Sequence, residues 1–314
     1  MNRHRAQFSY CTAALAVLII ILLSSCNTVE RADRSAFPEE EIRQLVENFR
    51  GDVGVYLLDM ESGSDFAIHA DTLFPTASTI KIPIMIGLFD KMDKDELGYG
   101  DTVVYDGEHD DTWGNDIINQ LQQGSEVELK RLIHLMMSTS NNTASLWNQH
   151  LAGTGAGINE LMDELGFTDT KVNSRTEGRH QDWEMYGWGQ STPKNLAEML
   201  LQIYRGELIS QHASEKMYRI MTRNFWDSES LSQIPPYINV ASKNGSVSRS
   251  KAEVLLVNGL SGDYLLCVMT KNQADDRRED DNEGFVLLRE ISALLYSHFE
   301  PNDSWTPNPE MAEF

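Results

Sequence analysis

The stretch FPTASTIKIP at residues 74–83 contains the pair on which the interpretation of the chain depends, Ser78 and Lys81. A serine hydroxyl is a weak nucleophile at neutral pH unless a neighbouring group takes its proton. If a helix runs from Ser78 to about Met92, the two side chains lie one turn apart on the same face, and the helix N-terminus favours negative charge at the serine oxygen. The pair therefore predicts a nucleophilic Ser78, although a Ser followed three residues later by a Lys is expected about once by chance in a chain this long.

Two further polar motifs follow in order. Residues 138–144 read STSNNTA after a helical run, and residues 243–246 read KNGS at the end of a β-rich stretch. The order S-x-x-K, S-D-N, K-T-G is typical of class A β-lactamases and penicillin-binding proteins. Residues 53–63 also resemble the first hairpin of those enzymes, and residues 191–200 resemble the exit of their omega loop. The chain thus resembles the class A β-lactamase family over roughly residues 40–300.

The resemblance implies catalytic roles for three motif residues. Ser78 would attack a lactam carbonyl, with Lys81 or a water held by Glu177 taking its proton, and Ser140 would pass a proton to the leaving nitrogen. The oxyanion would be held by the backbone N–H groups of Ser78 and Ser246, and loss of one such donor typically lowers the rate about 10²–10³-fold. A simpler interpretation is that Ser78 and Ser140 only begin helices.

Substrate binding is implied for a second set of positions. Asn142 would hydrogen-bond the side-chain amide of the substrate, and Trp113 would wall the cleft. Lys243 is a further catalytic position implied by the resemblance, and it would keep the region of the leaving nitrogen positive. The simpler alternatives are a helix-entry residue, an exposed lysine at a strand end and a structural tryptophan. The remaining positions assigned to substrate binding are Asn244, Gly245, Ser246 and Gln181.

The loop before residue 191 is expected to supply the base for deacylation. Class A enzymes carry there a glutamate two residues after an arginine, and Arg175 and Glu177 have that spacing. Gln181 lies four residues past Glu177, where the family has an asparagine that holds the same water. The aspartate that usually pairs with the arginine is missing, so either Asp182 or Glu184 is expected to pair with Arg175.

Two of the three motifs depart from the family pattern. Asn141 stands where an aspartate is usual and keeps hydrogen-bonding capacity without the charge. Asn244 stands where a hydroxyl helps to bind the substrate carboxylate, so altered substrate recognition is expected. Replacing Asn244 by Thr is predicted to raise the turnover of penicillins.

The first 26 residues have the layout of a lipoprotein signal peptide. A basic start precedes a short apolar run at 13–23, and the sequence LSSC at 23–26 resembles a lipoprotein signal box. We therefore expect an exported protein, lipid-anchored to a bacterial membrane through Cys26, with its catalytic domain in the periplasm. A plain transmembrane anchor or an ordinary cleaved signal is the alternative.

Composition limits the partners. The formal net charge of −22 argues against nucleic acid as a partner. The eight histidines show no metal-binding spacing, so neither a metal nor another cofactor is predicted. The acidic runs at 106–111 and 275–281 are predicted to be solvated loops, and Cys267 a small core residue. A monomer is expected.

Hydrophobic periodicity predicts strands at both ends of the chain with helices between them, which indicates an α/β (α+β) fold of two lobes. The family resemblance implies a β-lactamase-like architecture, with a five-stranded antiparallel sheet flanked by helices and an all-helical lobe. The sheet lobe is predicted to be discontinuous, and the site to lie where the lobes meet. The predicted boundaries are 27–75 with 226–300 for the sheet lobe, 76–225 for the helical lobe and 301–314 for a loose tail. The expected helices are 39–48, 78–92, 127–137, 143–151, 157–165, 193–204, 210–222 and 285–298. The expected strands are 53–59, 65–69, 237–242, 252–257 and 264–270.

Three functions are consistent with these observations. The leading one is a serine β-lactamase that forms an acyl-enzyme on Ser78 and releases it with water activated by Glu177. The second is a penicillin-binding protein or D-Ala-D-Ala peptidase that releases its acyl group slowly. The third is a sensor of β-lactams or peptidoglycan that has no turnover.

Overall fold

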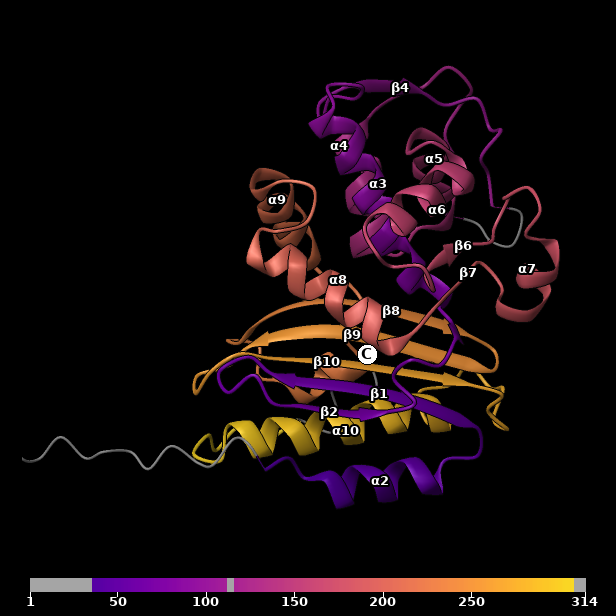
Figure 1. Cartoon of the computed structure of the whole chain (residues 1–314). Helices are drawn as coiled ribbons and strands as arrows, with labels where there is room; N and C mark the ends of the chain where they lie inside the picture. Colours follow the sequence, from indigo (N-terminus) through magenta and orange to yellow (C-terminus); the bar gives the residue numbers. More distant parts are fainter. Residues whose placement is uncertain (1–35, 112–115, 308–314) are drawn as a thin grey trace, which may run out of the picture. The chain divides into compact units, whose positions relative to one another are not determined.

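The computed structural model describes residues 36–111 and 116–307. Its centre is a five-stranded antiparallel sheet (Figure 1). The strands, in spatial order, are β2 (Asp65–Ile68), β1 (Asp52–Asp59), β10 (Tyr264–Lys271), β9 (Ser250–Asn258) and β8 (Asn239–Val247). Strands from both ends of the chain are thus neighbours, as the alternating patterns predicted, and the predicted fold class is confirmed.

Helices cover both faces of the sheet. α2 (Glu39–Asn48) and α10 (Glu283–Phe299) lie against one face, and α8 (Pro193–Arg205) crosses the other (Figure 1). The α2 and α10 face is closed by an apolar cluster that includes Val55, Leu255, Leu266 and Ile291, all at most 1% exposed. Because strand side chains alternate between faces, the neighbouring positions Val254 and Leu265 belong to the cluster on the other face.

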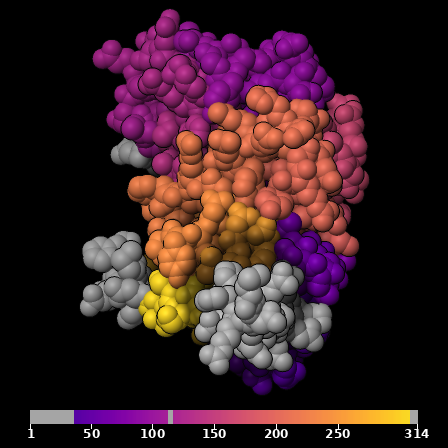
Figure 2. Space-filling view, turned by 90° about the vertical axis from the view of Figure 1, so that its left-hand side faces the viewer, coloured from indigo at the N-terminus to yellow at the C-terminus, as the bar shows by residue number. Residues whose placement is uncertain are grey.

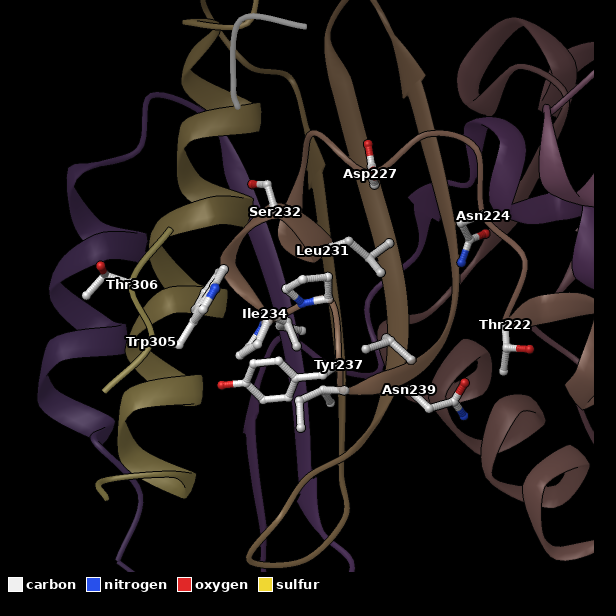
Figure 3. Close-up of a pocket in the computed structure, with 14 residues that line it drawn as sticks. Thr222, Asn224, Asp227, Leu231, Ser232, Ile234, Tyr237, Asn239, Trp305 and Thr306 are labelled. Carbon is white, nitrogen blue, oxygen red and sulfur yellow. The ribbon is translucent and has the colours of Figure 1, made fainter. Parts of the chain in front are cut away.

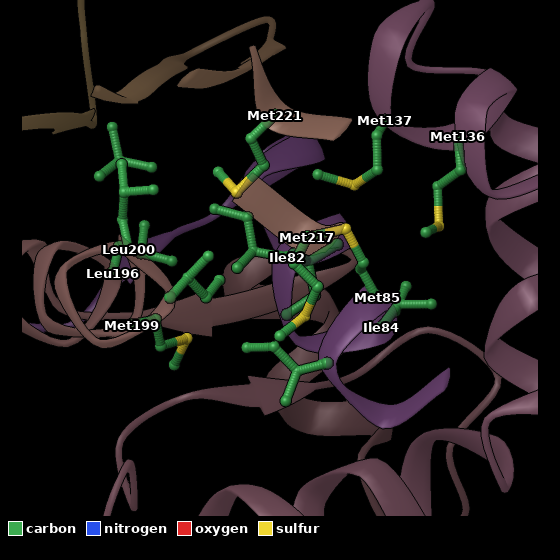
Figure 4. Close-up of a cluster of buried hydrophobic side chains, with 14 of the residues drawn as sticks. Ile82, Ile84, Met85, Met136, Met137, Leu196, Met199, Leu200, Met217 and Met221 are labelled. Carbon is green, nitrogen blue, oxygen red and sulfur yellow. The ribbon is translucent and has the colours of Figure 1, made fainter. Parts of the chain in front are cut away.

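The chain between β2 and β8 is mostly helical. Its helices of ten residues or more are α3 (Lys81–Asp93), α4 (Leu129–Ser138), α5 (Asn142–Leu151), α6 (Thr154–Glu164), α8 and α9 (Gln211–Met221). The side chains that join α3 to α4, α8 and α9 are rich in methionine (Figure 4). Met85, Met137, Met217 and Met221 surround Ile82 there, and flexible thioethers suit the irregular space between crossing helices. Figure 2 shows the salmon and orange residues that lead into β8 between the violet helical part and the yellow C-terminal part.

Several short elements were not predicted. A three-stranded sheet joins β3 (Phe74–Pro75), β7 (Gly189–Ser191) and β6 (Lys171–Val172), and a two-stranded one joins β4 (Thr102–Val104) and β5 (Glu126–Glu128). Helix α7 (His180–Tyr186) lies in the segment expected to be an omega loop. Two 3₁₀ helices, η1 (Ala77–Ile80) and η2 (Ser230–Gln233), precede α3 and β8. These elements are too short to show a hydrophobic period.

Three further expectations are corrected. The strand predicted to end at residue 242 continues through the motif at Lys243–Ser246, because β8 ends at Val247. The predicted loose tail is anchored at two residues, because Tyr237 and Tyr296 both donate to the Asp303 carboxylate and Trp305 lies against Tyr296. Within the acidic runs expected to be solvated, Asp111 and Asp275 are buried. Cys267 is buried in the core, as predicted.

Some predictions lie outside the described residues. These are the signal peptide with Cys26, and Trp113. Within 36–111 and 116–307, no helix combines the length and apolar character needed to cross a membrane.

Candidate active site

The nucleophile motif forms a tight turn at the start of α3. Ser78 lies in η1, and Lys81 is the first residue of α3. Ala77, directly before the serine, has a φ of 45°. A non-glycine residue in this region is strained by about 1–3 kcal/mol and persists only where its surroundings enforce it. Here β3 and its pairing with β7 hold the chain just before the turn.

Lys81 is fully buried, and its Nζ lies among four oxygens. It is 3.0 Å from Ser78 Oγ, 2.9 Å from Ser140 Oγ, 2.5 Å from Ser140 O and 2.9 Å from Asn142 Oδ1. Burial, with a smaller contribution from the charge of Lys243, holds the pKa of Lys81 well below its usual value. The carbonyl of Ser140 and the amide oxygen of Asn142 can only accept hydrogen bonds. If the amine is neutral, these two acceptors take its two N–H bonds and its lone pair is left for a hydroxyl.

The second motif joins α4 to α5. Ser140 has a φ of 57°, another strained position beside the lysine. Asn141 caps α5, with its Oδ1 accepting from the Ala144 N–H at 2.7 Å. A carboxylate does lie beside Asn141, and it belongs to Asp116. Asp116 accepts from the Thr143 N–H at 3.0 Å and contacts the Asn141 side chain. These bonds hold the pKa of Asp116 below its usual value. Asp116 thus supplies the charge that the missing aspartate would have carried.

Asn142 connects the lysine to a second acidic residue. Its Nδ2 donates to Asp111 Oδ2 at 2.9 Å. Asp111 is only 7% exposed, and its backbone N–H donates to Thr143 Oγ1 at 3.1 Å. The charge of Asp111 acts to raise the pKa of Lys81, against the larger effect of burial.

The third motif brings β8 against the nucleophile turn. A Cβ added to Gly245 would lie 2.6 Å from Ser78 N and 2.7 Å from Thr76 O, so only glycine allows this approach. Lys243 is 1% exposed, and its Nζ donates to Asn244 O at 2.8 Å and to Asn244 Oδ1 at 3.0 Å. Burial lowers the pKa of Lys243 to about 8, although Glu229 and Glu253 act to raise it. Ser246 follows on β8 and is exposed.

The sequence model of the Beta-lactamase enzyme family matches residues 37–299. The chain belongs to this family. It is 21% identical to the extended-spectrum β-lactamase PER-1 of Pseudomonas aeruginosa over 90% of this chain and 94% of that one. It is 23% identical to the β-lactamase VEB-1 of the same organism over 62% of this chain and 66% of that one.

Solved structures share the fold. PBP-A superposes with a TM-score of 0.73 at 23% identity, over 84% of this chain and 96% of that one. A β-lactamase from Sphaerobacter thermophilus gives a TM-score of 0.73 at 23% identity, over 84% of this chain and 97% of that one. A mutant of PBP-A was solved as an acyl-enzyme complex with penicillin G, with a TM-score of 0.72 at 22% identity, over 85% and 98% of the two chains. At these identities the likeness shows the fold alone.

The segment that should carry the deacylating base of a class A β-lactamase is built differently here. Glu177 is exposed, and it makes no hydrogen bond or ion pair with any residue of the described ranges. It lines a cavity of about 550 Å³ together with Asp111, Ser174 and Trp188. Gln181 is exposed on α7. The structure therefore brings Ser78, Lys81, Ser140 and Asn142 together, as the β-lactamase resemblance implied, but leaves Glu177 and Gln181 outside this hydrogen-bonded group.

The arginine pairing expected in this segment is corrected. Arg175 donates to the backbone carbonyls of Glu108 and Asp110, not to Asp182 or Glu184. Asp182 pairs instead with Arg179 at 3.3 Å, and Glu184 with His180. Arg179 ties the segment together, because it also donates to Asn173 Oδ1 and Gln190 Oε1, both at 2.9 Å. The role of Arg179 was not predicted, because Arg175 and Glu177 already had the spacing expected of the family.

A larger cavity, of about 760 Å³, lies apart from the catalytic motifs. It is lined by Asn224, Asp227, Leu231, Tyr237 and Trp305, among others (Figure 3). None of the residues of the three β-lactamase motifs lines it. Its connection to them is indirect, through the bond from Asn224 Nδ2 to Ser242 Oγ at 2.9 Å.

Proposed function

We propose that the protein is a serine enzyme that is acylated at Ser78 by β-lactams and hydrolyses them. The observation that supports this most directly is the position of a buried lysine of low pKa, Lys81, with its Nζ 3.0 Å from Ser78 Oγ and 2.9 Å from Ser140 Oγ. A nucleophile within hydrogen-bond reach of a base that is itself oriented by further groups is the arrangement needed for covalent catalysis.

Acylation follows from these contacts. Neutral Lys81 takes the Ser78 proton as Oγ bonds to the lactam carbonyl carbon, and the oxyanion is held by the N–H groups of Ser78 and Ser246. The C–N bond then breaks, and Ser140 Oγ gives its proton to the leaving nitrogen while it receives one from Lys81 Nζ. The products are an ester on Ser78, an opened ring and a neutral lysine, so the protons balance.

Hydrolysis of the ester requires a base for water, and two carboxylates are candidates. Glu177 is the choice implied by the β-lactamase resemblance and lines the cavity beside the site. Asp111 lines the same cavity and is linked to Lys81 through the side chain of Asn142. Of the two, Asp111 is the carboxylate that lies within one side chain of the catalytic lysine.

A chromogenic cephalosporin in large excess over purified protein tests this proposal. Sustained release well beyond one equivalent, abolished in Ser78→Ala, would support hydrolysis. Glu177→Gln and Asp111→Asn then identify the base, because the true base, once removed, leaves the first equivalent intact and suppresses the later ones. Absence of any release or covalent adduct would exclude the proposal.

A second candidate is an enzyme that acylates but releases slowly, as a penicillin-binding protein or D-Ala-D-Ala peptidase does with β-lactams. The exposed position of Glu177, without a hydrogen bond to any described residue, favours this candidate. A burst that stops near one equivalent in the wild type, and an unchanged course in Glu177→Gln, would distinguish it from a β-lactamase.

We also propose that the protein is exported and lipid-anchored through Cys26. The support is the sequence of residues 1–26 alone. Labelling of the protein by a radioactive fatty acid in a bacterial host, lost in Cys26→Ala, tests it. Recovery of the wild type as an unlabelled soluble protein would contradict it.

A further inference from the structure

Two buried glutamates lie behind the third motif, and neither acylation nor hydrolysis uses them. Glu229 is the residue before η2 and is 8% exposed, and Glu253 lies in β9 and is 1% exposed. Glu229 Oε2 accepts from Asn244 Nδ2 at 2.9 Å, and Glu253 Oε2 accepts from the Ser230 N–H at 2.9 Å. Glu253 is also the direct cross-strand partner of Asn244. Both carboxylates therefore lie at Asn244, where the motif is expected to meet the substrate.

The two carboxylates share a buried environment that favours their protonated forms. Burial and then the charge of Glu229 raise the pKa of Glu253 to about 8, and burial raises the pKa of Glu229. Glu253 Oε1 is buried and has no hydrogen-bond partner among the described residues, as fits a carboxyl that stays protonated. The Asn244 amide and the Lys243 charge act to lower the pKa of Glu229, against the larger effect of burial.

Lys243 is the main positive charge that acts on Glu229 and Glu253. Lys243 comes from β8, and Arg289 from α10 acts on Glu229 more weakly, its guanidinium donating to the carbonyls of Ser228 and Asp280. Two further titratable groups lie near the pair: Lys251 of β9 interacts with the charge of Glu229, and the buried thiol of Cys267 on β10 interacts with that of Glu253. Glu229 thus already interacts with Lys243 before any substrate binds.

The side-chain donors of Lys243 and Asn244 already have acceptors within the protein. Lys243 donates twice to Asn244, and Asn244 donates to Glu229. A substrate carboxylate would compete with Glu229 for these donors and would lie close to a buried negative charge. Like charges at such a site disfavour each other strongly. An uncharged ester or amide at the same place meets no such repulsion.

We propose that Glu229 and Glu253 determine substrate selection at this site, so that it prefers acyl donors with an uncharged ester or amide against Asn244 over those with a free carboxylate. The inference rests on the proposed acylation of Ser78 and names its substrate class. Both glutamates are positioning residues, because they act through Asn244 and Lys243. The sequence shows only that Asn244 replaces a hydroxyl; the carboxylates behind it become evident only in the fold.

The test compares one chromogenic cephalosporin as its free acid and as its methyl ester. The ratio of kcat/KM for ester over acid is measured in the wild type, Glu229→Gln, Glu253→Gln and the control Glu300→Gln. Glu300 is also a buried carboxylate, bonded to Ser261, so its replacement makes the same chemical change elsewhere. Thermal unfolding of each variant shows whether it folds.

We expect the wild type to prefer the ester and Glu229→Gln to shift the ratio at least 10-fold toward the acid, mainly through KM for the acid. In that variant the substrate carboxylate replaces Glu229 as the anion beside Lys243. Glu253→Gln should change the ratio less, since Glu253 is already protonated, and Glu300→Gln should leave it within twofold of the wild type.

The outcomes separate the inference from the function on which it rests. A wild type that prefers the acid, with a ratio unchanged in Glu229→Gln, overturns the inference while leaving acylation of Ser78 intact. Failure of both substrates to acylate Ser78 overturns the proposed function, and the inference with it. If Glu229→Gln does not fold, the ester preference of the wild type alone decides.

Discussion

The side-chain amide of Asn142 donates a 2.9 Å hydrogen bond to the Asp111 carboxylate. The oxygen of the same amide lies 2.9 Å from Lys81 Nζ, so one planar group links this buried lysine to a buried acid. The donor expected to meet a substrate is therefore engaged before substrate arrives. Asp111 both orients Asn142 and influences the protonation of Lys81.

Asp111→Asn is expected to move the acid limb of the acylation pH profile to lower pH. Asp111 raises the pKa of Lys81, and without its charge the lysine loses its proton more readily. Because neutral Lys81 is the base, a lower pKa keeps it active in more acidic solution. Stopped-flow acylation by a fluorescent penicillin across pH measures the limb, and a shift to higher pH would contradict this assignment.

Lys243→Met is expected to move the same limb in the opposite direction. The charge of Lys243 lowers the pKa of Lys81, so its loss lets Lys81 hold a proton to higher pH. Acylation should also slow at every pH, since the region loses positive charge. The position of the limb, not the rate, is the informative quantity, and an unchanged midpoint would show that the two lysines are not coupled.

Asn141→Asp is expected to destabilise the fold, although it restores the usual family residue. The new carboxylate would lie against Asp116, and a like charge that shifts a pKa by one unit corresponds to about 1.4 kcal/mol. Urea unfolding measures the loss. Adding Asp116→Asn to Asn141→Asp should recover part of it, and a single variant as stable as the wild type would show that Asp116 does not supply the missing charge.

Gly245→Ala is expected to lower acylation at least 100-fold. Its Cβ would lie 2.6 Å from Ser78 N, so either β8 or the nucleophile turn must move, and overpacking typically costs about 1–3 kcal/mol. Gly157→Ala is the matched control, because a Cβ there meets no atom within 4 Å and α6 should gain about 0.5–1 kcal/mol. Near-normal acylation by Gly245→Ala would refute the close approach of β8.

Glu253→Gln is expected to become more stable than the wild type as the pH rises. The pKa of Glu253 is raised from 4.5 to about 8 in the folded protein, so the folded state binds the extra proton between these values. In the wild type, the contribution of Glu253 to the free energy of unfolding is fully present below about pH 4.5 and is lost as the pH rises through about 8. The free energy falls by at most about 1.4 kcal/mol per pH unit over this range. Glutamine stays neutral, so urea unfolding at pH 5 and pH 8 should show a smaller pH dependence in the variant.

The long elements and the nucleophile cluster could be predicted because their signals are local. Periodicity located α2 at 39–48 and strand β1 within one residue, and motif spacing brought Ser78, Lys81 and Ser140 together. The acidic residues of the site could not be predicted, since Asp111 lies in a run that is indistinguishable from a solvated loop. Glu229 and Glu253 meet Asn244 only through the pairing of β9 with β8 and the placement of η2.

The same contacts revise one expectation about Asn244. From the motif alone, Asn244→Thr is predicted to raise penicillin turnover. Threonine would leave Glu229 Oε2 without the donor it now has in Asn244 Nδ2. We therefore expect a gain only when Glu229→Gln is introduced together with Asn244→Thr.

The proposed function depends on covalent acylation of Ser78, with Lys81 as the base. Intact-protein mass spectrometry after incubation with benzylpenicillin, followed by peptide mapping, tests it most directly. We predict a single adduct with the mass of the penicillin on the peptide that contains Ser78. This adduct should be absent in Ser78→Ala and should form at least 100-fold more slowly in Lys81→Ala. An adduct on another residue, or one that persists in Ser78→Ala, would contradict it.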